Sequence, residues 1–174
     1  MGRGFSTAAL TRAGSNTTEA TTTSTTAVDL LSVSGLSIPA AAPIRIEYLG
    51  RKSSGAAAVA KCGLTINATV VGEAVVSASA RGYSTSATDQ AESGFAFIEI
   101  GPRIASYVCG AHGMQKSAVT ASGAYALGSV LDDISGAAVF PTVAITDIVI
   151  RGISNSALVT LAVDELHIYV FGTP

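Results

Sequence analysis

Short apolar segments alternate with turn-forming residues along most of this chain, and this pattern limits the fold more than any other feature. In residues 44–49 (Ile-Arg-Ile-Glu-Tyr-Leu), every second residue is large and apolar or aromatic, and Arg and Glu fill the positions between. Side chains of a strand point alternately to opposite faces, so this segment is predicted to be a half-buried strand. Residues 143–150 and 158–171 show similar patterns and flank a turn at 152–156. The sequence predicts a β-hairpin there.

About eight to ten such segments, spaced roughly 8–12 residues apart, are typical of an antiparallel sandwich or barrel. Helical periodicity is weak; residues 115–131 are the most open to a helical alternative, which Gly123 and Gly128 disfavour. A chain of 174 residues has the size of one ordinary domain. We therefore predict an all-β fold with a single sandwich domain over residues 27–174.

A polar segment, residues 1–26, precedes this domain and is called the N-terminal arm below. Its last ten residues contain seven threonines and no large apolar residue. Such a tract buries too little apolar surface to offset the entropy of ordering, but threonine accepts an extended conformation readily. We predict a flexible arm that becomes a strand only when a neighbour in an assembly supplies a sheet edge.

The composition favours an assembly. Hydrophobic residues make up 48% of the chain and charged residues 13%, so few side chains are available to solvate a free surface. An obligate oligomer is the expected result. The formal net charge of −2 provides no positive field for nucleic acid, and no apolar run approaches a membrane span or a secretory signal. Neither nucleic acid nor a membrane is predicted as a partner.

The candidate catalytic and metal-binding residues are few and scattered. His112 and His167 are the only histidines, and a zinc site near Cys109 and His112 would lack its third ligand. Cys62 and Cys109 could form one disulfide, but nothing in their spacing indicates that they meet, and two buried free thiols are the favoured prediction.

The paired acids, Asp132-Asp133 and Asp164-Glu165, do not predict a glycosidase, because neighbours on a strand point to opposite faces. The chain contains no nucleophile elbow, phosphate-binding loop or zinc-protease motif. We predict no catalytic residue, no metal and no cofactor; a constellation assembled across strands is the one enzymatic alternative left open. The sequons at Asn16 and Asn67 are attributed to chance.

Four segments carry a family resemblance: residues 34–39 (Ser-Gly-Leu-Ser-Ile-Pro), 43–48 (Pro-Ile-Arg-Ile-Glu-Tyr), 145–153 and 158–169. As a pattern over residues 30–171, the chain resembles the jelly-roll structural proteins of tailed-phage virions, and most nearly the trimeric capsid decoration, or cement, proteins. The resemblance implies a jelly-roll sandwich, a homotrimer bound to the major capsid protein on the outer shell, and an arm that reaches neighbouring subunits. Such a protein would be made in the host cytoplasm and located on the virion. Tail-fibre tips and other trimeric adhesins or carbohydrate-binding modules share this plan and stay as the alternative.

Under this hypothesis two sets of residues carry the function. The arm contacts to the shell are Arg3, Arg12, Thr21, Thr22 and Thr23. The core and subunit-interface residues are Ile44, Ile46, Tyr48, Phe95, Phe97, Ile148, Ile150, Tyr169 and Phe171. A carbohydrate-binding module would need exposed aromatic residues instead, and without Trp the candidates are Tyr83 and Tyr107.

Overall fold

The computed structural model describes residues 9–40, 42–67, 69–71, 91–103, 106–117, 125–128 and 143–172. Within these ranges the chain forms β-strands and no helix. The strands are β1 (Leu10–Asn16), β2 (Ala20–Thr22), β3 (Val28–Ile38), β4 (Ile44–Lys52), β5 (Ala60–Ile66), β6 (Thr69–Val71), β7 (Glu92–Arg103), β8 (Ser106–Ser117), β9 (Tyr125–Gly128), β10 (Ile145–Ser154) and β11 (Leu161–Phe171).

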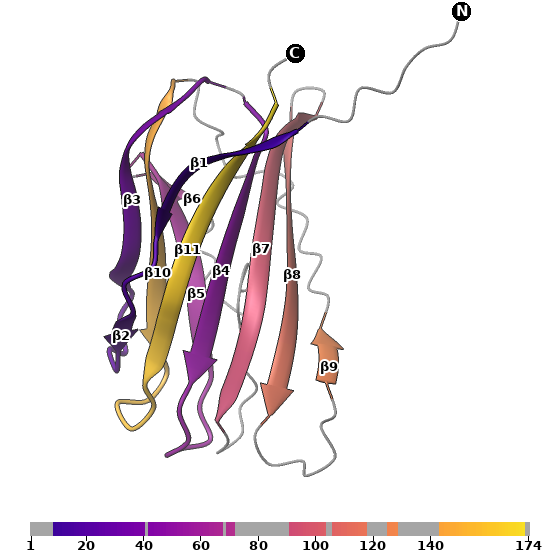
Figure 1. The fold of residues 1–174 in the computed structure, drawn as a ribbon. Helices are drawn as coiled ribbons and strands as arrows, with labels where there is room; N and C mark the ends of the chain where they lie inside the picture. The colour runs from indigo at the N-terminus through magenta and orange to yellow at the C-terminus, as the bar shows by residue number, and fades with distance from the viewer. Residues whose placement is uncertain are drawn as a thin grey trace, which may run out of the picture.

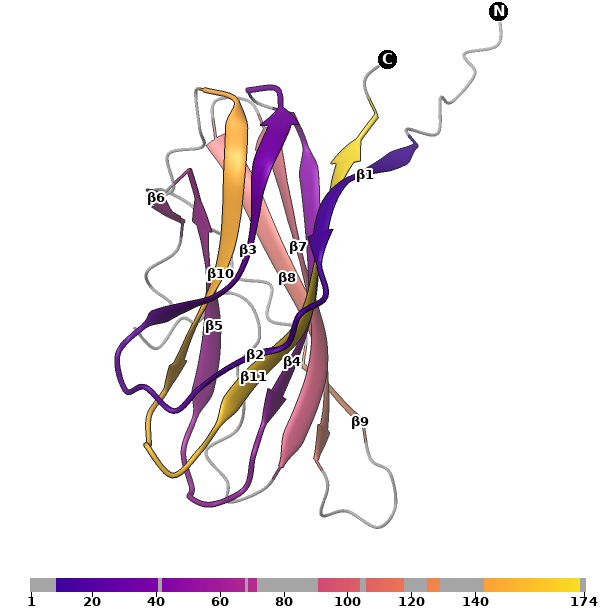
Figure 2. The same ribbon diagram turned by 60° about the vertical axis from the view of Figure 1, so that its left-hand side comes forward.

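Two antiparallel sheets pack face to face (Figures 1 and 2). The seven-stranded sheet has the order β1-β11-β4-β7-β8-β9, with β2 also paired to β11. The four-stranded sheet has the order β3-β10-β5-β6. The predicted all-β antiparallel sandwich is therefore confirmed.

The core lies between the sheets and follows the alternation seen in the sequence. On β4, Ile44, Ile46 and Tyr48 are buried, and the residues between them face outward. The facing sheet contributes Ile148 and Ile150 of β10, among others. Burying a side chain of this size stabilises the fold by about 1.5–3 kcal/mol, so these positions dominate the packing energy.

A β-bulge in β11 keeps its apolar side chains directed at the core. Leu161 and Val163 are buried at odd positions, whereas Leu166 and Ile168 are buried at even ones. The pairing register with β4 shifts between Val163 and Glu165, which leaves Asp164 as the extra residue. Because the side-chain period of a strand is two, this one residue moves the inward face from odd to even numbers.

The predicted hairpin between residues 143–150 and 158–171 is wrong. β10 pairs with β3 and β5, while β11 pairs with β1, β2 and β4, so the two strands belong to different sheets. Both edges of each strand are taken by other partners, and the connection after Ser154 crosses from one sheet to the other. Gly152 lies in β10 and not in a turn; a Cβ there would approach Leu30 Cδ1 to 2.4 Å and Leu161 Cδ2 to 2.7 Å.

Candidate interaction site

The N-terminal arm was the main candidate for partner contact, and its described part is docked on its own chain. β1 pairs with β11 from Leu10 opposite Phe171 to Asn16 opposite Leu166, and β2 continues along β11 from Ala20 opposite Val163. This differs from the expected arm that orders only in an assembly. The physical reason is that β11 of the same chain offers an open edge, whose backbone groups hydrogen-bond the arm.

The arm also contacts the second sheet. Gly14 lies so close to β3 that a Cβ would approach Val33 Cγ1 to 2.6 Å and Leu36 Cδ2 to 3.0 Å. Asn16 Nδ2 donates a hydrogen bond to the carbonyl oxygen of Ser32, at 3.0 Å. β1 therefore joins the edge of the seven-stranded sheet to β3 and closes one side of the sandwich (Figure 2).

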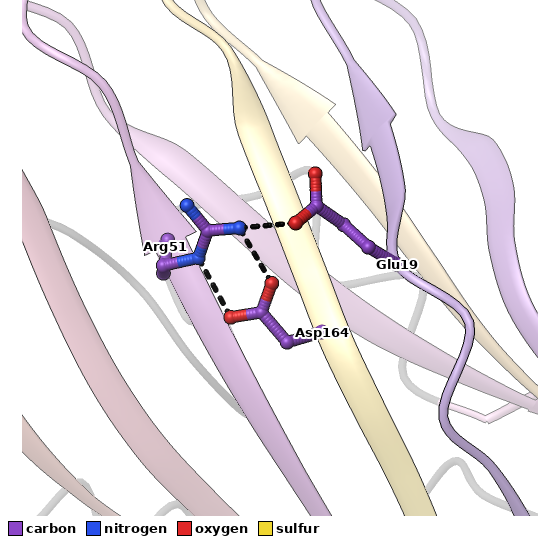
Figure 3. A network of polar contacts seen from close by, with 3 residues as sticks. All are labelled: Glu19, Arg51 and Asp164. Carbon is purple, nitrogen blue, oxygen red and sulfur yellow. Dashed lines mark hydrogen bonds and ion pairs between the residues drawn. The ribbon is translucent and has the colours of Figure 1, made fainter.

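Three charged side chains tie the turn between β1 and β2 to the sheet (Figure 3). Arg51 of β4 donates from Nε and Nη2 to the two carboxylate oxygens of Asp164, at 2.7 and 2.6 Å. Its Nη2 also donates to Glu19 Oε2 of the arm. The bulge in β11 turns Asp164 toward the outer face, where Arg51 reaches it.

This geometry shifts the pKa values of Asp164 and Arg51. Hydrogen bonds from Arg51 lower the pKa of Asp164, against a smaller opposing effect of desolvation. The hydrogen bond to Asp164, together with both carboxylate charges, raises the pKa of Arg51. Because Arg51 and Glu19 are about half exposed, water screens the cluster, and it fixes position more than it adds stability.

A second group of polar side chains lies on the outer face of β11. The guanidinium of Arg12 lies 5.9 Å from the centre of the Tyr169 ring, a cation–π arrangement. His167 Nε2 lies 3.1 Å from Glu165 Oε2. Glu165 and Asp164 thus both face outward, contrary to the expectation that adjacent acids point to opposite faces, because the bulge interrupts the alternation.

The structure separates the residues that were predicted to form the core or the subunit interface. Ile44, Ile46, Tyr48, Ile148 and Ile150 are fully buried, so the folded chain does not offer them to a neighbour. Tyr169 and Phe171 are half-buried, on the strand that carries the arm. The five buried residues therefore stabilise the sandwich, and Tyr169 and Phe171 lie on the strand that pairs with the arm.

Phe95 was predicted to belong to the core or to a subunit interface; it is 36% exposed and so does not belong to the core. It lies opposite Leu49 in the register between β4 and β7, and Phe97 lies opposite Glu47, whereas Ile98 lies opposite the buried Ile46. The side chain of Phe97 lies outside the described residues. The outward position of Phe95 was signalled by Glu99, which shares its alternation and belongs on a solvated face.

The residues expected to contact a shell lie as follows. Arg12, Thr21 and Thr23 are exposed, and Thr22 is half-buried against the sandwich. Arg3 lies outside the described residues. The arm thus uses its backbone within its own chain and keeps three of the predicted contact side chains in solvent.

The described residues contain no group of three or more His, Cys, Asp and Glu side chains that could hold a metal ion. Cys62 is a buried free thiol, and burial raises its pKa to about 12. It is therefore protonated at neutral pH and is a poor nucleophile. The side chains of Cys109, His112 and Tyr107 lie outside the described residues, as do the two segments that contain Tyr83 and the pair Asp132-Asp133.

Sequence reasoning missed the role of Asn67, which was set aside as a chance sequon. Its backbone is left-handed, with φ of 49°. The side-chain oxygen accepts a hydrogen bond from Thr146 N at 2.8 Å, and Nδ2 donates to Ala144 O at 2.8 Å. Asparagine tolerates this conformation and can imitate a backbone pair, so the residue ends β5 and anchors the start of β10.

Comparison with known proteins gave no matching family model, no matching curated protein and no matching solved structure. In the described part of the chain, no helix meets the length and hydropathy needed to span a bilayer.

Proposed function

We propose that the chain is a non-enzymatic structural protein of a tailed-phage virion: a decoration protein that binds the outer surface of the capsid as a homotrimer and stabilises it. The observation that carries this proposal is the order in which the strands pair. Composition supports it, since a chain with 13% charged residues is poorly suited to remain a free monomer.

The pairing order supports a jelly-roll plan if two simplifications are made. β1 and β2 lie along one edge of β11 and count as one strand, and β8 with β9 counts as an addition beyond β7. The eight remaining positions then pair first with eighth (β1 with β11), second with seventh (β3 with β10), third with sixth (β4 with β7) and fourth with fifth (β5 with β6). A long hairpin rolled into two sheets has this connectivity, and such double-sheet folds recur in capsid proteins and lectins.

Within this proposal the arm has a narrower role than the sequence implied. The backbone of residues 10–16 and 20–22 is paired with β11, so these two strands are not free to pair with a neighbouring subunit. Two of the arm's exposed side chains, Arg12 and Thr21, stay available for contact with the major capsid protein. Decoration requires only complementary surfaces, and the buried area at those surfaces would stabilise the shell.

Mass spectrometry of purified virions, from the phage or induced prophage that carries this gene, tests the proposal. We expect the chain in intact particles and in empty heads, and its release from heads when they are disassembled. Its absence from particles would overturn the proposal. Its recovery with purified tails, together with glycan binding by the purified protein, would favour the adhesin alternative.

A further inference from the structure

Three loops meet at one end of the sandwich, at the bottom of Figure 1, and we call this surface the loop end. It consists of residues 23–27 between β2 and β3, 53–59 between β4 and β5, and 155–160 between β10 and β11. Backbone hydrogen bonds join all three: Ser154 N to Ser24 O (2.8 Å), Asn155 N to Val59 O (3.0 Å) and Ser53 N to Thr160 O (2.9 Å). The loop end is therefore one connected surface that is built on both sheets.

This surface contains no charged side chain, although the structure describes all three loops in full. Two of the charges that flank it are paired: Asp29, whose side chain is 71% exposed, lies 3.0 Å from Arg151, and Arg51 is held by Asp164 and Glu19. Lys52, beneath the 53–59 loop, is buried and donates from Nζ to Ala58 O at 2.9 Å. Within the three loops themselves, the side chains that reach solvent are uncharged polar or apolar groups.

Leu158 projects from this surface and is 72% exposed, the most exposed large apolar side chain among the described residues. Its backbone packs closely against Gly55, where an added Cβ would lie 2.5 Å from Leu158 O, and Leu158 N donates a hydrogen bond to Ser156 Oγ at 3.2 Å. The side chain is therefore exposed to water, and a partner that covers it would remove apolar area from solvent.

We propose that the loop end is the surface through which three copies of this chain meet around their symmetry axis, with Leu158 at the centre of the contact. The proposal rests on the homotrimer of the proposed function and names the part of the molecule that forms it. At this contact, the loop end of one chain meets the loop ends of a second and a third chain.

Symmetry is the reason why the missing charge matters. Close to a rotation axis, each side chain meets its own copies, so any charged group there faces the same charge and is repelled. A surface with no charge and one projecting Leu avoids this repulsion and gains apolar burial. The outer face around Phe95 is less suited, because Glu165 and Phe95 both pair in register with Leu49, and Glu165 would be carried to the axis with its copies.

The test measures the mass of the full chain in solution by mass photometry and sedimentation velocity. We expect a trimer for the wild type and a monomer for Leu158→Asp, which brings three carboxylates together at the axis. Leu10→Asp is the matched control: Leu10 is also exposed, at 46%, but lies on β1 away from the loop end, and this variant should stay trimeric.

The outcomes separate the two proposals. A trimeric Leu158→Asp beside a trimeric wild type overturns the loop end as the contact and leaves the homotrimer intact. A monomeric wild type overturns the homotrimer itself, and the inference with it.

If the Leu158→Asp variant fails to fold, crosslinking of a second variant tests the same contact. In Leu158→Cys, oxidised glutathione should link two copies covalently, which non-reducing electrophoresis detects as a dimer band. Leu10→Cys and the wild type should give no such band. A Leu158→Cys chain that stays uncrosslinked while trimeric would contradict the contact.

Discussion

At the scale of single residues, Gly55 and Gly35 both have a positive φ but differ in what surrounds them. Gly55 has φ of 138°, a conformation that residues with a Cβ rarely adopt, and the carbonyl oxygen of Leu158 fills the place of a side chain. Gly35 also has a positive φ, of 69°, but no atom lies within 4 Å of the Cβ position. A side chain at Gly55 would therefore cause both backbone strain and a steric collision, whereas a side chain at Gly35 would cause backbone strain alone.

We predict that Gly55→Ala lowers the free energy of unfolding by about 2–3 kcal/mol, because strain and collision act together. Gly35→Ala should cost about 1 kcal/mol, the ordinary strain of a left-handed alanine. Denaturant unfolding of both variants measures the difference. Equal losses would show that the contact with Leu158 O is relaxed at no cost.

The buried thiol of Cys62 gives a prediction on alkaline stability. Burial raises its pKa from 9.0 to about 12, so between these values the unfolded chain releases a proton that the folded chain retains. Stability from this group is complete below pH 9 and falls as the pH rises toward 12. Cys62→Ala should show a flatter decline over this range, measured by denaturant unfolding at several pH values. An unchanged slope would contradict the shift.

At the scale of elements, the docked arm is the main revision of the sequence-based expectation. Removing residues 1–26 would strip the edge of β11 and uncover Val33 and Leu36 on β3. We predict a loss of about 3 kcal/mol or more, since each such side chain contributes about 1.5–3 kcal/mol when buried. Thermal unfolding measures the loss. As a control, Thr21→Ser with Thr23→Ser should be neutral; an unaffected truncated chain would restore the separable arm.

The Arg51 cluster holds the arm through Glu19, and its effect should depend on pH. The pKa of Asp164 is lowered from 3.8 in the folded state, so the pair stabilises above that value and its contribution is lost as the pH falls through the lowered pKa. We predict that Asp164→Asn costs at most about 1 kcal/mol at pH 7, because the pair is exposed.

Hydrogen exchange should also quicken in β2 in this variant. A double-mutant cycle with Arg51→Gln isolates the pair. A coupling energy that persists at pH 2 would argue against the ionic origin.

Single strands could be predicted from the sequence, but their partners could not. The alternation in residues 44–49 and 145–150 is local, and β4 and β10 form where it lies. Pairing is a competition between distant edges, so residues 143–171 were mistaken for a hairpin and the arm for a free segment. The sequence did not decide between core and surface for Phe95, because both faces of residues 95–100 carry apolar residues and only Glu99 distinguishes them.

At the scale of the whole molecule, the candidate contact surfaces were the least predictable feature. The loop end depends on three segments that are far apart in the chain and are brought together by the strand order. No local pattern marks Leu158 as exposed, since it begins an apolar run whose next members, Val159 and Leu161, are buried. Composition indicated an assembly but could not locate its contact.

A homotrimer that forms through this contact should be more stable when it is concentrated. We predict that the melting temperature of the wild type rises with protein concentration, because association stabilises only the folded chain. Leu158→Asp should melt at a temperature that does not change with dilution. Differential scanning calorimetry over a hundredfold concentration range checks both, and a flat wild-type curve would contradict coupled assembly.

The pairing of β1 with β11 also sets the order of events during synthesis. The edge that β1 needs is made from Leu161–Phe171, so residues 10–16 leave the ribosome on the order of ten seconds before their partner exists. Until then β1 does not cover Val33 and Leu36, and the larger sheet lacks β11 together with the arm strands that pair with it. The sandwich can close only after translation has passed β11, and the nascent chain must stay unaggregated through that interval.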